Sequence, residues 1–217
     1  MVEQKGYYVN KWLGLLFGGT FPFLCYYPGE SIILGATILS LFFLNLHVQR
    51  KESSLISVAV TLLGILYIGW LFSFLAKIRC LEYGKYWVGY LIFVTKMGDA
   101  AAYFVGKKCG TLRLNKKISP NKTVEGACAG LLTATVCSLG IRLFVPEINV
   151  VQALILGFFI GVLAQLGDLA ESLIKRDVGV KDSGFIPGLG GVLDILDSLL
   201  FTAPFLYYYL SAVIGGA

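Results

Sequence analysis

The stretch Gln165–Ser198, QLGDLAESLIKRDVGVKDSGFIPGLGGVLDILDS, joins two long apolar segments near the C-terminal end of the sequence. Ionised groups next to a membrane are costly, about 2.5 to 3.5 kcal/mol each at the centre of a membrane helix. The stretch nevertheless holds six acidic and three basic residues around a glycine-rich turn: Asp168, Glu171, Lys175, Arg176, Asp177, Lys181, Asp182, Asp194 and Asp197. We therefore expect it to form a polar site for metal and phosphate.

The composition of the chain indicates an integral membrane protein. Hydrophobic residues make up 57% of the 217 residues and charged residues 14%, whereas soluble domains carry about 25% charged residues. Several apolar runs are long enough to cross a bilayer as helices. They lie at about 12–27, 31–48, 54–76, 86–106, 124–145, 150–173 and 192–214. We predict an all-α polytopic protein with about six or seven transmembrane helices.

The placement of ionisable residues divides the chain into two parts. The first three apolar runs carry none in their interior, so we expect residues 1–85 to be scaffold. We expect residues 86–217 to be one folding unit and to carry the site. This unit would contain a basic loop at 107–123 and the charged loop at 174–198.

Basic residues also predict the orientation in the membrane. Six of the eighteen lie between Lys107 and Lys122, where there is no acid. In so apolar a chain we interpret them as a topology signal and as partners of anionic lipids or a triphosphate, and not as a nucleic-acid site. Two spans separate this loop from 174–191, so both should face the cytoplasm from the inner (cytoplasmic) membrane. The loop predicted at 77–85 conflicts with this scheme, because it is basic and would lie outside.

The fourth apolar run differs from the first three because it contains Lys96 and Asp99, three residues apart on one helix face. Two interpretations stay open. The pair is a structural salt bridge, or Asp99 faces a polar cavity while the small residues Ala100–Ala102 let another helix approach. After the basic loop, Thr123 is expected to cap the next helix, a favourable place for a phosphate beside Lys122.

Carboxylates that converge from two helices are a usual means of holding Mg²⁺, which takes oxygen ligands and keeps waters for substrate phosphates. Asp168 and Asp194 flank the glycine loop and are expected to face each other. Two ions about 3.5 to 4 Å apart would suit a phosphoryl or nucleotidyl transfer. Lysine and arginine side chains nearby would neutralise a triphosphate.

Two blocks of the sequence resemble the CDP-diacylglycerol synthase (phosphatidate cytidylyltransferase) family. The first, GDAAAYFVGKKCGTLRLNKKISPNKTVEG at 98–126, resembles its D-x-x-A-Y-F-x-G and K-I-S-P-x-K-T-x-E-G motifs. The second, SLIKRDVGVKDSGFIPGLGGVLDILDS at 172–198, resembles S-x-x-K-R, then K-D, then P-G-H-G-G-x-x-D-R-x-D. The resemblance covers about residues 90–217.

The resemblance implies an all-helical membrane enzyme that uses CTP and phosphatidate to make CDP-diacylglycerol and pyrophosphate. It implies Mg²⁺, with room for a second metal ion, and a homodimer among membrane lipids. The catalytic residues carried over are Asp168, Asp194 and Lys175, and the metal ligands are Asp168, Asp194 and Asp197. The substrate-binding residues carried over are Ser119, Lys122, Thr123, Glu125, Ser172, Arg176, Lys181, Asp182, Gly190 and Gly191.

The chain departs from the family pattern at two positions. Leu189 stands where the pattern has histidine, and Ile195 stands where it has arginine. Losing an imidazole and a guanidinium removes two groups that can contact phosphate or orient an acid. A slower enzyme, a homologue that no longer catalyses and a transferase for another lipid phosphate therefore stay open. An ion-coupled transporter is disfavoured, because the acids gather at one face and the spans show no internal repeat.

Overall fold

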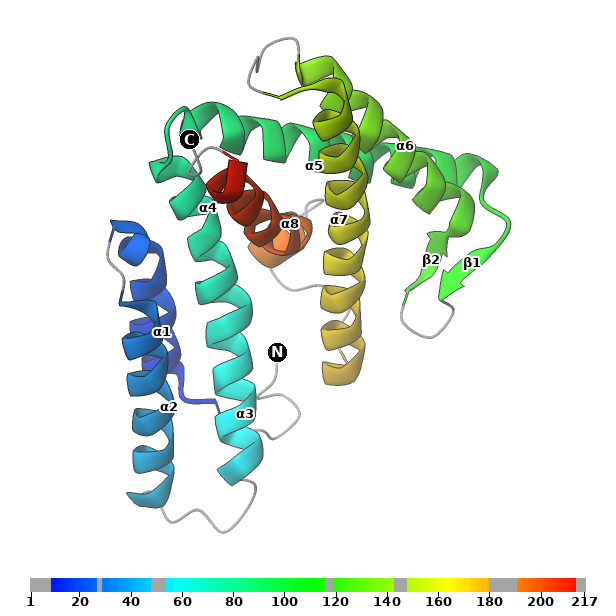
Figure 1. Cartoon of the computed structure of the whole chain (residues 1–217). Coiled ribbons are helices and arrows are strands. Elements are labelled where there is room, and N and C mark those ends of the chain that lie inside the picture. Colours follow the sequence, from blue (N-terminus) through cyan, green and yellow to red (C-terminus); the bar gives the residue numbers. More distant parts are fainter. Residues whose placement is uncertain are drawn as a thin grey trace. The chain divides into compact units, whose positions relative to one another are not determined.

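A computed structural model describes residues 9–26, 29–47, 54–115, 119–142, 148–179 and 191–213 (Figure 1). The chain divides into two compact units, Met1–Glu82 and Tyr83–Ala217. The boundary lies three residues before the one predicted at 85/86.

The described residues of the first unit form helical segments. They are α1 (Lys11–Thr20), the 3₁₀ segment η2 (Phe21–Tyr26), α2 (Glu30–His47), α3 (Ser54–Gly64), the π-helical segment η3 (Ile65–Trp70) and α4 (Leu71–Cys80). The last three follow one another without a break. Buried apolar side chains from four elements form the core: Phe21, Leu41, Val58 and Ile65. A Cβ on Gly69 would lie 2.6 Å from the Cα of Gly18, so η3 and α1 pack at backbone distance.

The loop predicted at 77–85 is wrong in its extent, because α4 continues to Cys80 and the next helix begins at Gly84. Lys77 is therefore a helical residue, and it is buried. It forms an ion pair with Glu30 and lies 4.4 Å from the ring centroid of Phe74. These partners offset the cost of burying its charge, so the helix extends further than the apolar run alone predicts.

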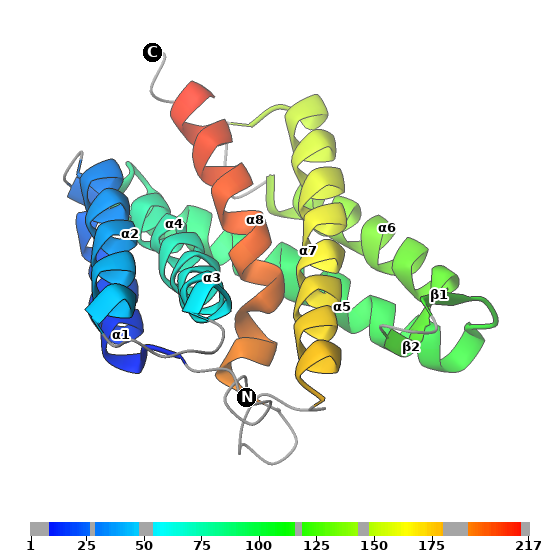
Figure 2. The same cartoon turned by 90° about the horizontal axis from the view of Figure 1, so that it is seen from below.

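The second unit contains four long helices and a hairpin. Its elements are α5 (Gly84–Cys109), β1 (Arg113–Asn115), β2 (Ser119–Thr123), α6 (Val124–Ile141), α7 (Val150–Val178) and α8 (Val192–Val213). Helix α5 contacts the other three helices, and α7 packs between α6 and α8 (Figure 2). Helix α7 begins with a capping box at Asn149 and Gln152, and it ends at Gly179, whose φ of 78° favours glycine.

Small residues allow these helices to approach one another closely. A Cβ on Gly126 of α6 would lie 2.6 Å from the carbonyl oxygen of Ala102 in α5. A Cβ on Gly167 of α7 would lie 2.5 Å from the carbonyl oxygen of Asp197 in α8. Close packing of this kind is typical of membrane helices. There the hydrophobic effect does not drive association, and small residues permit the van der Waals contacts that do.

The basic segment predicted as a loop at 107–123 is only partly irregular. Helix α5 runs to Cys109, and β1 and β2 pair antiparallel, with Arg113 opposite Thr123 and Asn115 opposite Ser119. The short strands RLN and SPNKT lack the apolar alternation that identifies a strand in a sequence. The prediction of an all-α membrane protein is confirmed, with this small hairpin as an addition.

Four helices among the described residues are long and apolar enough to cross a membrane: Leu55–Cys80, Gly84–Cys109, Val124–Ile141 and Val150–Val178. The apolar stretch Glu30–Leu44 is shorter. Helix α6 ends at Ile141, before the predicted 145. The number of six or seven spans therefore stays a prediction, whereas the character of an integral membrane protein is evident.

Candidate active site

A cavity of about 590 Å³ lies in the second unit, between the hairpin and helices α5, α6 and α7. Five of the predicted site residues line it: Asp99, Ser119, Lys122, Thr123 and Asp168. The cavity carries acids on its helical side and basic residues near the hairpin. This arrangement suits a ligand that has both a metal-binding and an anionic part.

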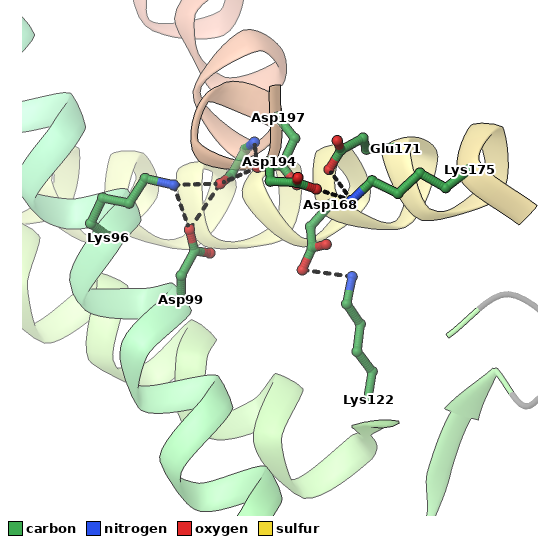
Figure 3. Close-up of polar contacts among 9 residues, drawn as sticks. Lys96, Asp99, Lys122, Asp168, Glu171, Lys175, Asp194 and Asp197 are labelled. Atoms are coloured by element: carbon green, nitrogen blue, oxygen red, sulfur yellow. Dashed lines mark hydrogen bonds and ion pairs between the residues drawn. The ribbon is translucent and has the colours of Figure 1, made fainter. Parts of the chain in front are cut away.

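The basic residue of the hairpin reaches the acid of helix α7. Lys122 Nζ lies 2.6 Å from Asp168 Oδ2, and Figure 3 shows the two side chains pointing toward each other across the opening. Both remain partly accessible, with side-chain exposures of 26% and 43%. Lys122 Nζ itself is shielded from solvent and Asp168 is the more exposed member, so a charged ligand would reach the pair through the cavity that both residues line.

A second lysine joins α7 to α8. Lys175 Nζ lies 3.1 Å from Glu171 Oε2, and it also forms an ion pair with Asp194. Glu171 and Lys175 are four residues apart, so they lie on the same face of α7. Its link to Asp194 brings together the two sides of the charged loop (Figure 3).

A third lysine joins α5 to α8. Lys96 Nζ lies 3.2 Å from Asp99 Oδ2 and 3.2 Å from Ser198 Oγ, and Ser198 Oγ lies 2.8 Å from the same Asp99 oxygen. Ser198 Oγ also lies 3.1 Å from Asp197 Oδ1. Both interpretations of Asp99 therefore hold, because it forms the salt bridge with Lys96 and it also lines the cavity.

The two acids of α8 differ in exposure. Asp197 is only 4% exposed, whereas the Asp194 side chain is 17% exposed. Asp197 faces the close contact with Gly167 and takes a hydrogen bond of 2.6 Å from the backbone amide of Ser198. Its burial was not visible in the sequence, because the start of an apolar helix looks like a surface position.

The residues drawn in Figure 3 test whether a divalent cation fits this cluster. At the junction of α7 and α8, four acids outnumber the two lysines that pair with them: Asp168, Glu171, Asp194 and Asp197 against Lys122 and Lys175. Glu171 is 1% exposed, and its Oε1 receives no hydrogen bond from the described residues. Excess negative charge and an oxygen without a donor suit a cation. The donor types therefore fit Mg²⁺.

The described residues do not form a complete metal cage. No three acidic, histidine or cysteine side chains within the described ranges are close enough together to hold an ion. Magnesium sites often use only one or two carboxylates and complete the shell with water and substrate phosphates. The ligand roles of Asp168, Asp194 and Asp197 stay predictions.

Several predicted substrate-binding residues lie elsewhere. Ser172 is half-buried on α7, and Arg176 is exposed near its end. The amide of Gly191 donates to Asp194 Oδ2, a different partner from the expected phosphate. Lys181, Asp182, Gly190 and Leu189 lie outside the described residues.

The start of α6 holds the base of the hairpin. Thr123 is the N-cap, as predicted, and its side chain accepts a hydrogen bond of 3.1 Å from the amide of Gly126. Glu125 accepts hydrogen bonds from the amides of Thr111 and Leu112, each at 3.1 Å from Oε1, and from the Thr111 hydroxyl. Its predicted role in binding substrate stays a prediction.

Sequence reasoning missed three polar residues of the cavity lining, Tyr103, Asn121 and Gln165. Lys107 and Arg113 were predicted only as members of the basic segment. Gln165 lies one turn before Asp168, and its Nε2 donates to the carbonyl of Ala127 at 2.8 Å. Gln165 is three residues before Asp168, and Tyr103 is four residues after Asp99. Residues at these spacings share a helix face, so this spacing could have indicated both. No signal in the sequence distinguishes Arg113 from the other basic residues.

Comparison with known proteins gives consistent results. A model of the cytidylyltransferase family matches residues 2–213. The phosphatidate cytidylyltransferase of Bacillus subtilis (strain 168) is 45% identical over 155 residues, covering 69% of this chain and 56% of that protein. The phosphatidate cytidylyltransferase of Staphylococcus saprophyticus is 37% identical over 177 residues, covering 81% and 64%. An uncharacterized protein of Escherichia coli (strain K12), YnbB, is 44% identical over 128 residues, covering 58% and 43%.

These matches extend beyond the two blocks that carried the resemblance in the sequence. The chain covers between 43% and 64% of the length of these three relatives. The family match, by contrast, includes nearly every residue of the chain and both units of the fold. The chain belongs to the cytidylyltransferase family.

Proposed function

We propose that the protein is a nucleotidyltransferase that makes CDP-diacylglycerol and pyrophosphate from CTP and phosphatidate in phospholipid biosynthesis. The observation that carries this proposal is the acidic cluster of α7 and α8, which adjoins a cavity lined by basic residues. The names of two relatives support the choice of substrates. The membrane helices supply a place for a lipid substrate.

The basic residues around the cavity would hold the triphosphate. Lys107, Arg113 and Lys122 all line it, and together they offer positive charge to phosphate oxygens. A bound triphosphate would compete for Lys122, which in the free protein is paired with Asp168. Binding of the nucleotide would thereby release the Asp168 carboxylate at the place where the phosphates arrive.

The transfer itself is a single displacement. A phosphate oxygen of phosphatidate forms a new bond to the α-phosphorus of CTP. The bond from this phosphorus to the bridging oxygen breaks, and pyrophosphate leaves with that electron pair. Lys175 is held between Glu171 and Asp194, and its proposed role is to stabilise the negative charge that develops on the leaving oxygen.

Asp168, Asp194 and Asp197 are the residues that would hold Mg²⁺. When bound, the ion would neutralise phosphate charge and stabilise the leaving pyrophosphate. The side chains prepare for it by concentrating negative charge at the junction of α7 and α8. A second ion would find the remaining carboxylates of the same cluster.

The site is proposed to face the cytoplasm from the inner membrane, and the protein is proposed to act as a homodimer. Cys109 is exposed at the end of α5, next to the hairpin. In a variant that keeps only this cysteine, a membrane-impermeant thiol reagent should label inverted vesicles and not intact spheroplasts. Light scattering of the detergent-solubilised protein would measure its mass and test the dimer.

The proposed reaction is tested with the purified protein in detergent, supplied with phosphatidate, CTP and Mg²⁺. Release of pyrophosphate that requires all three components is the expected result. A folded protein that releases none would refute the proposal. Replacing phosphatidate with another lipid phosphate measures the substrate preference in the same assay.

A further inference from the structure

Glu125 has an unusual number of partners for a residue at the surface. Its Oε1 accepts hydrogen bonds from the backbone amides of Thr111 and Leu112, each at 3.1 Å, and from the hydroxyl of Thr111. The Leu112 amide also lies 3.3 Å from Oε2. All of these donors belong to the segment that leads from α5 into β1, so one carboxylate fixes the entry to the hairpin.

The base of the hairpin is packed tightly around this contact. The amide of Val124 donates to the carbonyl of Leu112 at 2.9 Å, which joins the start of α6 to the same segment. A Cβ on Gly106 would lie 3.0 Å from Thr123 Oγ1, and a Cβ on Gly110 would lie 2.6 Å from the same atom. The base therefore has little free space, and its geometry is set by these contacts.

The hairpin presents basic and polar groups to the cavity. Arg113 follows Leu112 directly and opens β1, and Ser119 and Lys122 belong to β2. All three line the cavity. A shift at Leu112 would consequently displace Arg113 most directly, and through the pairing of Arg113 with Thr123 it would displace β2.

We propose that Glu125 is a positioning residue that fixes the hairpin and thereby the basic groups that bind the triphosphate. Its role in turnover rests on the proposed function. The donors of the hairpin entry already engage its carboxylate, and a carboxylate that faced the triphosphate directly would repel it. Glu125 thus acts on the nucleotide through Arg113 and Lys122.

Hydrogen exchange tests this role without any substrate. The variants Glu125→Ala and Glu125→Gln are compared with the wild type and with Glu82→Gln, a matched change at an exposed glutamate. In Glu125→Ala the amides of Thr111 and Leu112 should exchange several-fold faster, because their acceptor is gone. Glutamine keeps one acceptor oxygen and should restore part of the protection. Unchanged exchange of both amides in Glu125→Ala would overturn the proposal.

Kinetics distinguish a positioning role from direct contact. Glu125→Ala should raise the KM for CTP about fivefold or more while kcat changes less than about twofold, with partial rescue in Glu125→Gln. The variant Thr111→Val removes one donor and should raise the KM in the same direction. The double variant should then be no worse than Glu125→Ala alone, because both changes break one contact. Additive effects would show that Glu125 acts independently of Thr111 and would overturn the proposal.

The two experiments separate this inference from the proposed reaction. If the wild type releases no pyrophosphate but the hairpin amides lose protection in Glu125→Ala, the reaction is refuted and the structural role of Glu125 stands. In that case the affinity for CTP alone, measured by calorimetry, replaces the KM. An affinity that is equal in the wild type and Glu125→Ala would overturn the positioning role.

Discussion

Each of the two units contains an ion pair between a lysine and an acid from separate elements, and the two pairs differ in their surroundings. In the first unit, Lys77 of α4 meets Glu30 of α2, with side-chain exposures of 10% and 28%. In the second, Lys122 of β2 meets Asp168 of α7, with exposures of 26% and 43%. The first pair, called the enclosed pair below, is the less exposed of the two, and the second, called the open pair, lies at the cavity of the candidate site.

The other contacts of the two pairs support the same distinction between them. Lys77 lies over the ring of Phe74. Glu30 Oε2 also accepts a hydrogen bond of 3.4 Å from the indole Nε1 of Trp70. A cavity of about 380 Å³ lies beside Glu30, which is the one charged group among the described residues that line it. Asp168, in contrast, shares its cavity with Arg113 and Lys107 as well as Lys122. The enclosed pair stabilises helix packing, and the open pair can exchange its partners for a ligand.

The largest expected effect is on catalysis, in the variant Asp194→Asn. The amide keeps the size of the side chain but removes the charge that pairs with Lys175. Release of pyrophosphate should fall by at least about a hundredfold, as for the loss of a group that stabilises developing charge. The matched control is Glu30→Gln, which removes an acid from the enclosed pair and should change the activity of folded protein less than about threefold. Equal losses in both variants would mean that the acids of the second unit have no special role in the reaction compared with the acid of the enclosed pair.

The lysines should separate stability from binding. Lys77→Met should lower the free energy of unfolding by about 2 kcal/mol, less than for a fully buried pair because Glu30 is 28% exposed. Lys122→Met should leave stability nearly unchanged and raise the KM for CTP about tenfold, because it removes one charge from the phosphate site. Thermal unfolding in detergent and steady-state kinetics measure the two quantities. A variant Lys122→Met that is destabilised with a normal KM would place both pairs in the same class.

Double variants test the same distinction, and the expected changes in stability and activity relative to the single variants are smaller. Replacing both members of the enclosed pair, Lys77→Met with Glu30→Gln, should recover most of the lost stability, because no unpaired charge remains. Replacing both members of the open pair, Lys122→Met with Asp168→Asn, should recover no activity, because each group is needed by the ligand. Recovery of activity in the second double variant would mean that this pair is structural.

Much of the site could be predicted because it depends on local spacing. The stripe from Asp168 through Glu171 to Lys175 follows from helix periodicity, and the N-cap Thr123 follows from the residue types at a helix start. These features require only a few consecutive residues. For that reason they can be inferred without knowledge of the fold.

The remaining features depend on residues that are distant in the sequence. Lys77 was assigned to a loop because its charge appeared to end the helix, and only the contact with Glu30 explains its burial. The hairpin was missed because pairing of Arg113 with Thr123 leaves no local pattern. The burial of Asp197 depends on the close approach of Gly167, which is a tertiary contact. Sequence patterns cannot supply such contacts, since each depends on how two elements meet.

The smallest effect is expected at Ile195, where the family pattern has arginine. Ile195 is 37% exposed in the first turn of α8, between Asp194 and Asp197, so an arginine fits there without being forced into the core. Its charge would offset part of the negative excess of the cluster, which helps to bind a triphosphate but competes with a cation for the same carboxylates. At a Mg²⁺ concentration near half-saturation, these opposing effects should limit the change in kcat/KM for Ile195→Arg to about threefold. The same substitution should raise the Mg²⁺ concentration that gives half-maximal activity, and a Mg²⁺ titration of both proteins measures this. An increase of tenfold or more in kcat/KM would show instead that the guanidinium binds phosphate directly, and that the open cluster is incomplete without it.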